Sequence, residues 1–250
     1  MSGPDRLRRV IVITGAGGAL GAAVSHRLAG EPETDLVLSD LAEPPLRATV
    51  DGLPEASSVA TALADVGDFD QVRSVVELAV ERHGRLDVAI ANAGVLAPSG
   101  RIHNLATEDW ERAFRTNVMG AVNLIRSAVP VMRQQAGGSI VLTASVSGLT
   151  AWSHAAPYCA TKAAVIQLAK VAAVEYAGDG IRVNCVCPGT FLSAIHEGLP
   201  AQALDAIASR HPLGLGSADD LVGAYSYLAG PDSRWTTGSA LVVDGGYSAP

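Results

Sequence analysis

Cysteine is scarce in this sequence, which argues against a disulfide scaffold. Only Cys159, Cys185 and Cys187 occur in 250 residues, whereas disulfide-stapled domains are short and rich in cysteine. Cys185 and Cys187 are separated by one residue in an apolar run, so on a strand both would point to the same face. That spacing suits a metal poorly, and the six histidines form no HxxH or HExxH pattern. We therefore predict buried structural thiols and no metal site.

Positive charge and long apolar runs are also missing. Charged residues make up 17% of the chain, the formal net charge is −7, and no basic block occurs. These features argue against nucleic acid or an anionic membrane as a partner. No apolar run approaches the roughly 18 residues of a membrane span, and segment 1–15 lacks the long apolar stretch of a signal peptide. We expect a cytoplasmic protein.

Small and aliphatic residues are abundant. The chain is 48% hydrophobic but only 4% aromatic, a composition that lets helices lie close on a sheet. The segment 43–58 is interrupted by prolines, so we expect a short or irregular crossover there. Short β-branched runs elsewhere alternate with helical stretches. They predict helices from the glycines to about residue 28 and at 70–84, 108–135 and 157–178, and strands at 10–14, 35–40, 59–65, 87–94, 138–145, 181–189 and 239–246.

Seven strands joined by crossover helices predict one parallel sheet covered on both faces. Because such crossovers are right-handed, a doubly wound, three-layer αβα arrangement is favoured. The sequence contains no recognisable linker and no internal repeat. We expect a single domain over residues 1–250.

A glycine-rich turn, VITGAGGALG (12–21), lies between the first predicted strand and the first predicted helix. Gly15, Gly17, Gly18 and Gly21 could bring backbone N–H groups and a helix N-terminus against a pyrophosphate. The turn is not GxGxxG, because residue 20 is leucine. Glycine-rich turns also serve tight packing of a strand on a helix, so this motif leaves two interpretations open.

Asp40 ends the second predicted strand, about twenty residues beyond the last of these glycines. A carboxylate there can bind a ribose 2′-hydroxyl and repel a 2′-phosphate. No Arg or Lys lies in the turn or directly after Asp40. The sequence therefore predicts NAD rather than NADP, with a solvated turn residue as the alternative interpretation of Asp40.

The stretch HAAPYCATKAAV (154–165) places Tyr158 four residues before Lys162. On a helix these two side chains share a face. Pro157 is suited to the start of that helix, so Tyr158 would lie in its first turn, where the positive end of the dipole favours a phenolate. The pair is either an ordinary packed pair or a phenol made acidic by an ammonium.

Several ordered motifs together resemble those of the short-chain dehydrogenases/reductases, over nearly the whole chain. TGAGGALG (14–21) resembles the family's TGxxxGxG turn, ALADV (62–66) its adenine-side strand end, and ANAG (91–94) its NNAG motif. Asn117 in RTNVMG, Ser145 in VLTASVSG, the Tyr158–Lys162 pair and RVNCVCPG (182–189) complete the set. Two departures stand out: Ala19 replaces the usual middle glycine of the turn, and Ala91 replaces the first Asn of NNAG.

The resemblance implies a Rossmann fold and hydride transfer between a carbinol carbon and a nicotinamide. Tyr158 would be the general acid/base, because Lys162 would favour the phenolate of a group whose pKa is ordinarily near 10. Ser145 would hydrogen-bond the substrate oxygen, Asn117 would help to hold a water linked to Lys162, and Lys162 would contact the nicotinamide ribose. The alternative is a set of satisfied polar residues in a packed core.

The resemblance also implies the residues that line each part of the site. Ser193 stands where many members have a threonine that touches the cofactor carboxamide, although it could instead cap a helix. His154 precedes Pro157, so we expect it on a loop. The substrate loop would span about 190–214, with Val146, Trp152, His154, Phe191 and His196 around the pocket. The implied cofactor-binding residues are Gly15, Gly17, Gly18, Ala19, Leu20, Gly21, Asp40, Asp65, Val66, Asn92, Ala93, Gly94, Tyr158, Lys162, Pro188, Gly189 and Ser193.

Three functional hypotheses follow. The first is an NAD-dependent secondary-alcohol dehydrogenase for a small cyclic or polyhydroxylated alcohol or ketone. The second is an NAD(P)H-dependent carbonyl or 3-oxoacyl reductase, which Asp40 disfavours. The third is a non-catalytic NAD-binding scaffold, which the intact set of Asn117, Ser145, Tyr158 and Lys162 disfavours. The C-terminal segment TTGSALVVDGGYSAP resembles the family's subunit-contact strand and tail, which implies a homotetramer.

Overall fold

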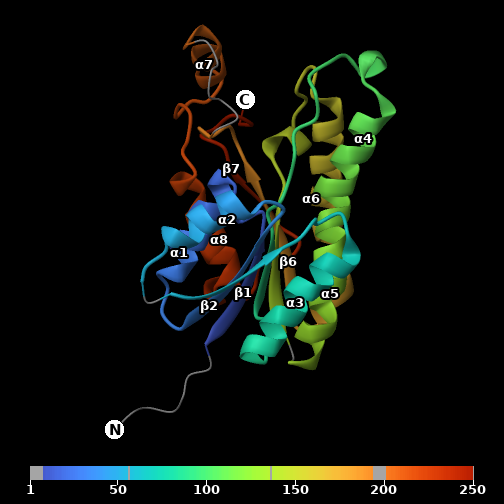
Figure 1. Cartoon of the computed structure of the whole chain (residues 1–250). Helices are drawn as coiled ribbons and strands as arrows, with labels where there is room; N and C mark the ends of the chain where they lie inside the picture. Colours follow the sequence, from blue (N-terminus) through green and yellow to red (C-terminus); the bar gives the residue numbers. More distant parts are fainter. Residues whose placement is uncertain (1–7, 56, 136, 194–200, 250) are drawn as a thin grey trace.

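A computed structural model describes residues 8–55, 57–135, 137–193 and 201–249. Its centre is one parallel seven-stranded sheet in the order β3-β2-β1-β4-β5-β6-β7 (Figure 1). The strand order reverses between β1 and β4, as in a doubly wound fold. The predicted sheet is therefore confirmed. Its strands are β1 (Arg9–Thr14), β2 (Thr34–Asp40), β3 (Ser58–Leu63), β4 (Val88–Ala91), β5 (Gly138–Thr143), β6 (Ile181–Pro188) and β7 (Ala240–Val243).

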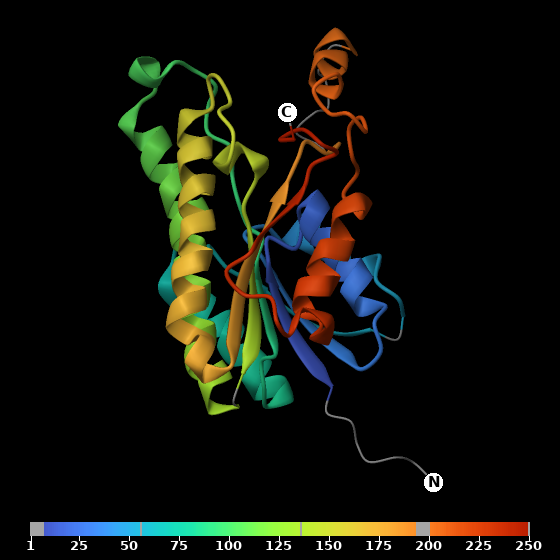
Figure 2. The ribbon, with the colours of Figure 1, turned by 180° about the vertical axis from the view of Figure 1, so that it is seen from behind.

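Helices cover both faces of the sheet. In Figures 1 and 2, α3, α5 and α6 lie on one face, and α1 and α8 lie on the other. No described helix is both long and apolar enough to cross a membrane. The helices are α1 (Ala19–Ala29), α2 (Glu43–Asp51), α3 (Phe69–His83), α4 (Thr107–Ala113), α5 (Gly120–Gln134), α6 (Ala156–Tyr176), α7 (Ala201–Ala208) and α8 (Asp219–Ala229).

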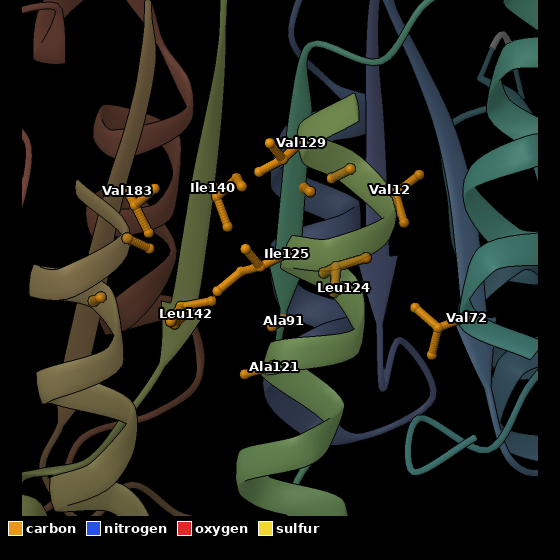
Figure 3. Packing of buried hydrophobic residues seen from close by; sticks show 14 of the residues in the cluster. Val12, Val72, Ala91, Ala121, Leu124, Ile125, Val129, Ile140, Leu142 and Val183 are labelled. Atoms are coloured by element: carbon orange, nitrogen blue, oxygen red, sulfur yellow. The ribbon is translucent and has the colours of Figure 1, made fainter. Parts of the chain in front are cut away.

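Alternating residues of each strand supply two separate cores. On β1, Val10 and Val12 belong to the cluster under α3, α5 and α6, whereas Ile11 and Ile13 belong to the cluster under α1 and α8. This alternation follows from the two-residue period of a strand and explains why the central strands are apolar on both faces. Figure 3 shows side chains of α5 directed at the sheet, namely Ala121, Leu124, Ile125 and Val129. The predicted three-layer arrangement is confirmed.

The two strand cysteines lie where the sequence predicted. Cys185 and Cys187 are fully buried, free, and on the same face of β6, in the core under α6. They therefore pack as small hydrophobic residues. Cys159 is a third free thiol, partly exposed, in the first turn of α6.

The prediction of an irregular crossover at 43–58 was wrong, because α2 is a regular nine-residue helix. Pro44 and Pro45 stand in its first turn, where a backbone N–H has no helical acceptor in any case. Leu46 and Thr49 then turn a buried face to the rest of the fold. The prolines begin this helix instead of breaking it.

The helix predicted over 108–135 is not uniform. A π-helical segment, Phe114–Met119, joins α4 to α5, and Asn117 lies buried within it. Such segments insert an extra residue into a helical turn and often mark functional sites. Pro130 lies inside α5. The structure thus replaces one expected helix by two, with a local change of pitch at Asn117.

Candidate active site

A cleft of about 890 Å³ opens at the carboxyl ends of the strands, where the strand order reverses. Doubly wound sheets bind ligands at this place, and the volume is in the range of small-molecule sites. The structure brings most of the predicted site residues to it. Those that line it are Gly15, Gly17, Gly18, Ala19, Leu20, Gly21, Asp40, Asp65, Val66, Asn92, Ala93, Gly94, Ser145, Trp152, Tyr158, Lys162, Pro188, Gly189, Phe191 and Ser193.

The glycine turn serves packing and also shapes the cleft. Gly15 has a φ of +67°, and a Cβ on it would lie 2.6 Å from Ala93 Cα, while a Cβ on Gly21 would lie 2.1 Å from Gly15 O. These two glycines are required by the protein's own packing. Gly18 is different: it is exposed to the cleft, and the nearest atom to its Cβ position is 3.6 Å away.

The N-terminus of α1 faces this turn and fits a phosphate group. Gly18 is its N-cap residue, no side chain caps the helix, and its first turn contains no acidic residue. The free N–H groups and the positive end of the helix dipole are therefore available to an anion in the cleft.

Asp40 is tied to the glycine turn. Its Oδ2 accepts a hydrogen bond of 2.9 Å from the Gly17 N–H, and its Oδ1 accepts one of 3.2 Å from the Ala42 N–H. The carboxylate thus stands at the end of β2 beside the turn. The described lining includes only two cations, Lys162 and Arg210, and neither comes from the part of the chain around Asp40.

The polar residues beyond the turn fasten neighbouring strand ends to one another. Asn92 Nδ2 donates to Gly15 O at 2.9 Å, and Asn92 Oδ1 accepts from Thr143 Oγ1 at 3.3 Å, so one amide links the ends of β1, β4 and β5. Asp65 pairs with Arg115 at 2.7 Å. These contacts hold the strand ends that line the cleft, and the loop that carries Asp65, in fixed positions.

Three of the four predicted catalytic residues meet on one wall. Tyr158 lies in the first turn of α6, which Pro157 helps to begin as predicted, and Lys162 lies one turn further on. Ser145 follows β5, with its Oγ accepting from the Ser147 N–H at 3.1 Å. Lys162 Nζ donates to Thr143 O at 2.7 Å and stands 5.7 Å from the Tyr158 ring centroid.

Asn117 lies behind this wall instead of lining the cleft. Its side chain brackets one residue, since Oδ1 accepts from the Val95 N–H at 2.7 Å and Nδ2 donates to Val95 O at 3.0 Å. Nδ2 also donates to Thr161 Oγ1 at 3.0 Å. Gly94 adjoins both Asn117 and Lys162, because a Cβ on it would lie 3.3 Å from Asn117 Oδ1 and 3.4 Å from Lys162 Nζ. Asn117 therefore holds the strand-β4 loop against α6.

The electrostatics of the pair differ from the expectation. Burial raises the pKa of Tyr158 above its ordinary value, although its interaction with Ser145 acts in the opposite direction. Burial also lowers the pKa of Lys162 to about 8. In the described structure burial therefore outweighs any lowering of the Tyr158 pKa by Lys162, whose ammonium donates to the Thr143 carbonyl. That Lys162 favours the phenolate stays a prediction.

Two of the predicted substrate-side residues do not line the cleft. Val146 is fully buried in a short 3₁₀ turn that follows Ser145. His154 lies on a loop, as predicted, with a φ of +66°, but it lines a separate hollow with Arg101 and His103. His196 lies outside the described residues. Trp152 and Phe191 are in the lining.

Comparison with known proteins agrees with this geometry. A family model described as enoyl-(acyl carrier protein) reductase matches residues 15–248. The chain belongs to the short-chain dehydrogenase/reductase family. It is 36% identical to cis-4-hydroxycyclohexanecarboxylate dehydrogenase of Sinomonas cyclohexanicum, over 96% of this chain and 97% of the relative. It is 35% identical to the 3-oxoacyl-[acyl-carrier-protein] reductase FabG of Thermotoga maritima, over 95% of this chain and 97% of the relative.

A solved structure described as ElxO with NADP bound is also similar, with a TM-score of 0.90 and 28% identity over 97% of this chain and all of that one. This short-chain dehydrogenase/reductase is therefore an oxidoreductase that acts on CH–OH groups or their carbonyl counterparts with NAD or NADP.

The two departures from the family motifs are tolerated for different reasons. Ala19 is exposed to the cleft at the first position of α1, so its methyl group has open space. Ala91 is buried at the end of β4, where a methyl group fills the core.

The sequence motifs of this dehydrogenase/reductase did not predict the residues that form the C-terminal wall of the cleft. Ile207, Arg210 and Tyr247 line it, and His211 joins them to the strand ends. His211 Nε2 accepts from the Thr190 N–H at 3.2 Å, and its ring lies 4.8 Å from that of Tyr247. No local spacing marks these residues. The only available signal was the position of the 190–214 segment.

Proposed function

We propose that this protein is an NAD-dependent dehydrogenase that interconverts a secondary alcohol and a ketone on a small cyclic or polyhydroxylated molecule. The observation that carries the proposal is the grouping of Ser145, Tyr158 and Lys162 on one wall of a cleft that Asp40 lines as well. We place the whole activity in one domain over residues 1–250.

The residues around the glycine turn fit NAD. The N-terminus of α1 would hold the pyrophosphate, and Asp40 would accept from a ribose hydroxyl and repel a 2′-phosphate. Asp65, Val66, Asn92, Ala93 and Gly94 would line its path to the catalytic wall, with Pro188, Gly189 and Ser193 across from it. When bound, the nicotinamide accepts or returns the hydride.

The chain's own residues handle the proton and the substrate oxygen. Ser145 Oγ would hold the substrate oxygen beside Tyr158, whose Oη would give a proton to a ketone or take one from an alcohol. Lys162 would steady the charge on Tyr158 and contact the nicotinamide ribose. Asn117 would be a positioning residue, because it hydrogen-bonds Val95, which follows Gly94, and Thr161, which precedes Lys162.

A panel of secondary alcohols tests the proposal. With NAD, we expect NADH absorbance to appear for cyclic or hydroxylated members, and Tyr158→Phe to abolish it. A protein that binds NAD in calorimetry yet oxidises no alcohol on the panel, and reduces no ketone, would be a scaffold, and the proposal would fail.

A second candidate, a ketone or 3-oxoacyl reductase, is favoured by one observation. Burial raises the pKa of Tyr158 and so favours the protonated phenol, which is the form that donates to a ketone. The two candidates share the site and differ in the direction of reaction, so comparing oxidation and reduction rates at neutral pH separates them.

A further inference from the structure

The acidic side chains that line the cleft lie at one end, and Arg210 lies at the other. Its acidic lining residues, Asp40 and Asp65, stand at the β2 and β3 side of the sheet. Arg210 follows α7 and lies with Tyr247, which follows β7 at the other side. Figure 1 shows α7 at the end of the molecule that lies beyond the carboxyl ends of the strands. In a chain of net charge −7, this end of the described cleft has no acidic lining residue.

A continuous aromatic wall connects Arg210 to the catalytic tyrosine. The Tyr158 and Trp152 rings stack with centroids 6.2 Å apart, and Trp152 meets Tyr247 edge-on, also at 6.2 Å. Arg210 Cζ then lies 4.9 Å from the Tyr247 ring centroid. Aromatic faces offer apolar contact area and orient a guanidinium by cation–π attraction. A ligand that touches both Tyr158 and Arg210 therefore needs an apolar body between two polar ends.

Two donors on this wall have no partner of their own. Among the described residues, neither Trp152 Nε1 nor Tyr247 Oη makes a hydrogen bond, although both atoms are buried. Buried polar atoms are nearly always paired, and leaving one unpaired costs free energy. Both residues line the cleft, so a ligand oxygen is a suitable acceptor once the side chains turn toward it.

We propose that the substrate of this enzyme is a hydroxy acid or keto acid, whose carboxylate is bound by Arg210 with help from Tyr247 Oη and Trp152 Nε1. Guanidinium and carboxylate match in charge and in planar geometry. The aromatic wall would carry the carbon skeleton, so the carboxylate lies at the end of the molecule away from the reacting carbinol. This inference rests on the proposed function only in taking Tyr158 as the reacting end.

Binding without turnover tests the inference independently of the dehydrogenase activity. Calorimetry with NAD present compares cyclohexanecarboxylate and benzoate with their neutral amides. We expect each acid to bind about tenfold more tightly than its amide, a difference suited to a partly exposed charge-assisted contact. Equal affinities, or no binding of either acid, would overturn the proposal.

Three variants locate the effect. Arg210→Met keeps an unbranched, mostly apolar side chain without the guanidinium, and it should remove the preference for the acid while leaving amide binding unchanged. Tyr247→Phe keeps the ring under Arg210. It should weaken binding of the acid by about threefold and leave binding of the amide unchanged. Arg82→Met, an exposed position near the end of α3, is the matched control and should change neither.

Further measurements separate carboxylate binding by Arg210 from misfolding, from a packing role and from phosphate binding. NAD affinity should be the same in all four proteins, which shows that each is folded. Equal weakening of acid and amide by Arg210→Met would mean a packing role and would contradict the proposal. Stronger binding of cyclohexyl phosphate than of the carboxylate would assign the subsite to a phosphate ester. Failure of the dehydrogenase proposal would appear separately, as absent NADH formation with intact acid binding.

Discussion

The Asp40 carboxylate accepts from the Gly17 and Ala42 amides, beside a turn without a neighbouring cation. A 2′-phosphate placed there would meet a negative charge, so we expect kcat/KM to favour NAD over NADP. Asp40→Asn keeps an oxygen for the Gly17 N–H and removes the charge. It should lower the NAD-to-NADP ratio of kcat/KM about tenfold, equivalent to about 1.4 kcal/mol. Steady-state kinetics with both cofactors measure the ratio, and a native preference for NADP would contradict the assignment.

Tyr158 should give the reaction a direction-dependent pH profile. Burial raises the pKa of its phenol, so the proton-accepting phenolate becomes more abundant as the pH rises. We expect kcat/KM for alcohol oxidation to increase with pH from neutral upward, whereas ketone reduction needs the protonated phenol and should not. Tyr158→Phe should lower both rates by about 10²- to 10⁴-fold. Oxidation that does not vary with pH would show that this phenol is not the base.

Residues differ in how well sequence alone predicts them. The glycine turn, Asp40 and the Tyr158–Lys162 pair were predictable because each depends on local spacing. The direction of the Tyr158 pKa was not, since it follows from burial by residues throughout the fold. The Gly15 and Gly21 contacts show the same limit: spacing indicated a tight turn, and only the fold shows which glycines the packing requires.

At the scale of elements, the π-helical segment between α4 and α5 places Asn117 against Val95 and Thr161. Asn117→Ala leaves the Val95 N–H and C=O without this partner. We expect the free energy of unfolding to fall by about 2 kcal/mol, and kcat to fall more than KM rises, because Lys162 loses its fixed surroundings. Denaturant unfolding and steady-state kinetics measure the two effects.

Gln135 provides a matched control for Asn117. Its amide brackets Leu86 in the same way, donating to Leu86 O at 2.6 Å and accepting from the Leu86 N–H at 3.1 Å, at the other end of β4. Gln135→Ala should cost similar stability and leave kcat unchanged. If both variants lowered kcat alike, loss of stability alone would explain the effect of Asn117→Ala.

Elements were predictable where one interaction dominates. The strands were found because apolar β-branched runs fill both faces of a covered sheet, as Val10 to Ile13 do in β1. The α2 helix was missed because Pro44 and Pro45 break a helix interior but suit a first turn. The π-helical segment was missed because one extra residue in a turn hardly changes the hydrophobic period over 108–135.

At the scale of the whole molecule, the cleft combines segments that are far apart in the sequence. Gly17 follows β1 and Asp40 ends β2, while Arg210 and Tyr247 come from the last fifth of the chain. The motif-bearing half of the cleft was therefore predictable and the substrate half was not. His211, which joins Thr190 to Tyr247, owes its position entirely to the tertiary fold.

The homotetramer implied by the C-terminal segment is a prediction about the surface of the whole molecule. Trp235, just before β7, is 97% exposed, and Val174 on α6 is 82% exposed. We propose that another copy covers these two side chains, because their burial would remove apolar surface from water. We expect light scattering after gel filtration to give a mass near four times 25.6 kDa. Trp235→Asp and Val174→Asp should each give smaller species, because an unpaired charge in an apolar interface is costly.

Val80→Asp, at a valine of α3 that is 36% exposed, carries the same new charge outside α6 and the segment before β7 and should leave the mass unchanged. Tyr158, Lys162 and Asp40, which we assign to the cofactor, line the same cleft of one chain. NAD binding should therefore persist in the smaller species, because no residue assigned to the cofactor comes from a neighbour. A native mass of 25.6 kDa would rule out the tetramer, and loss of NAD binding on dissociation would mean that a second copy helps to shape the cleft.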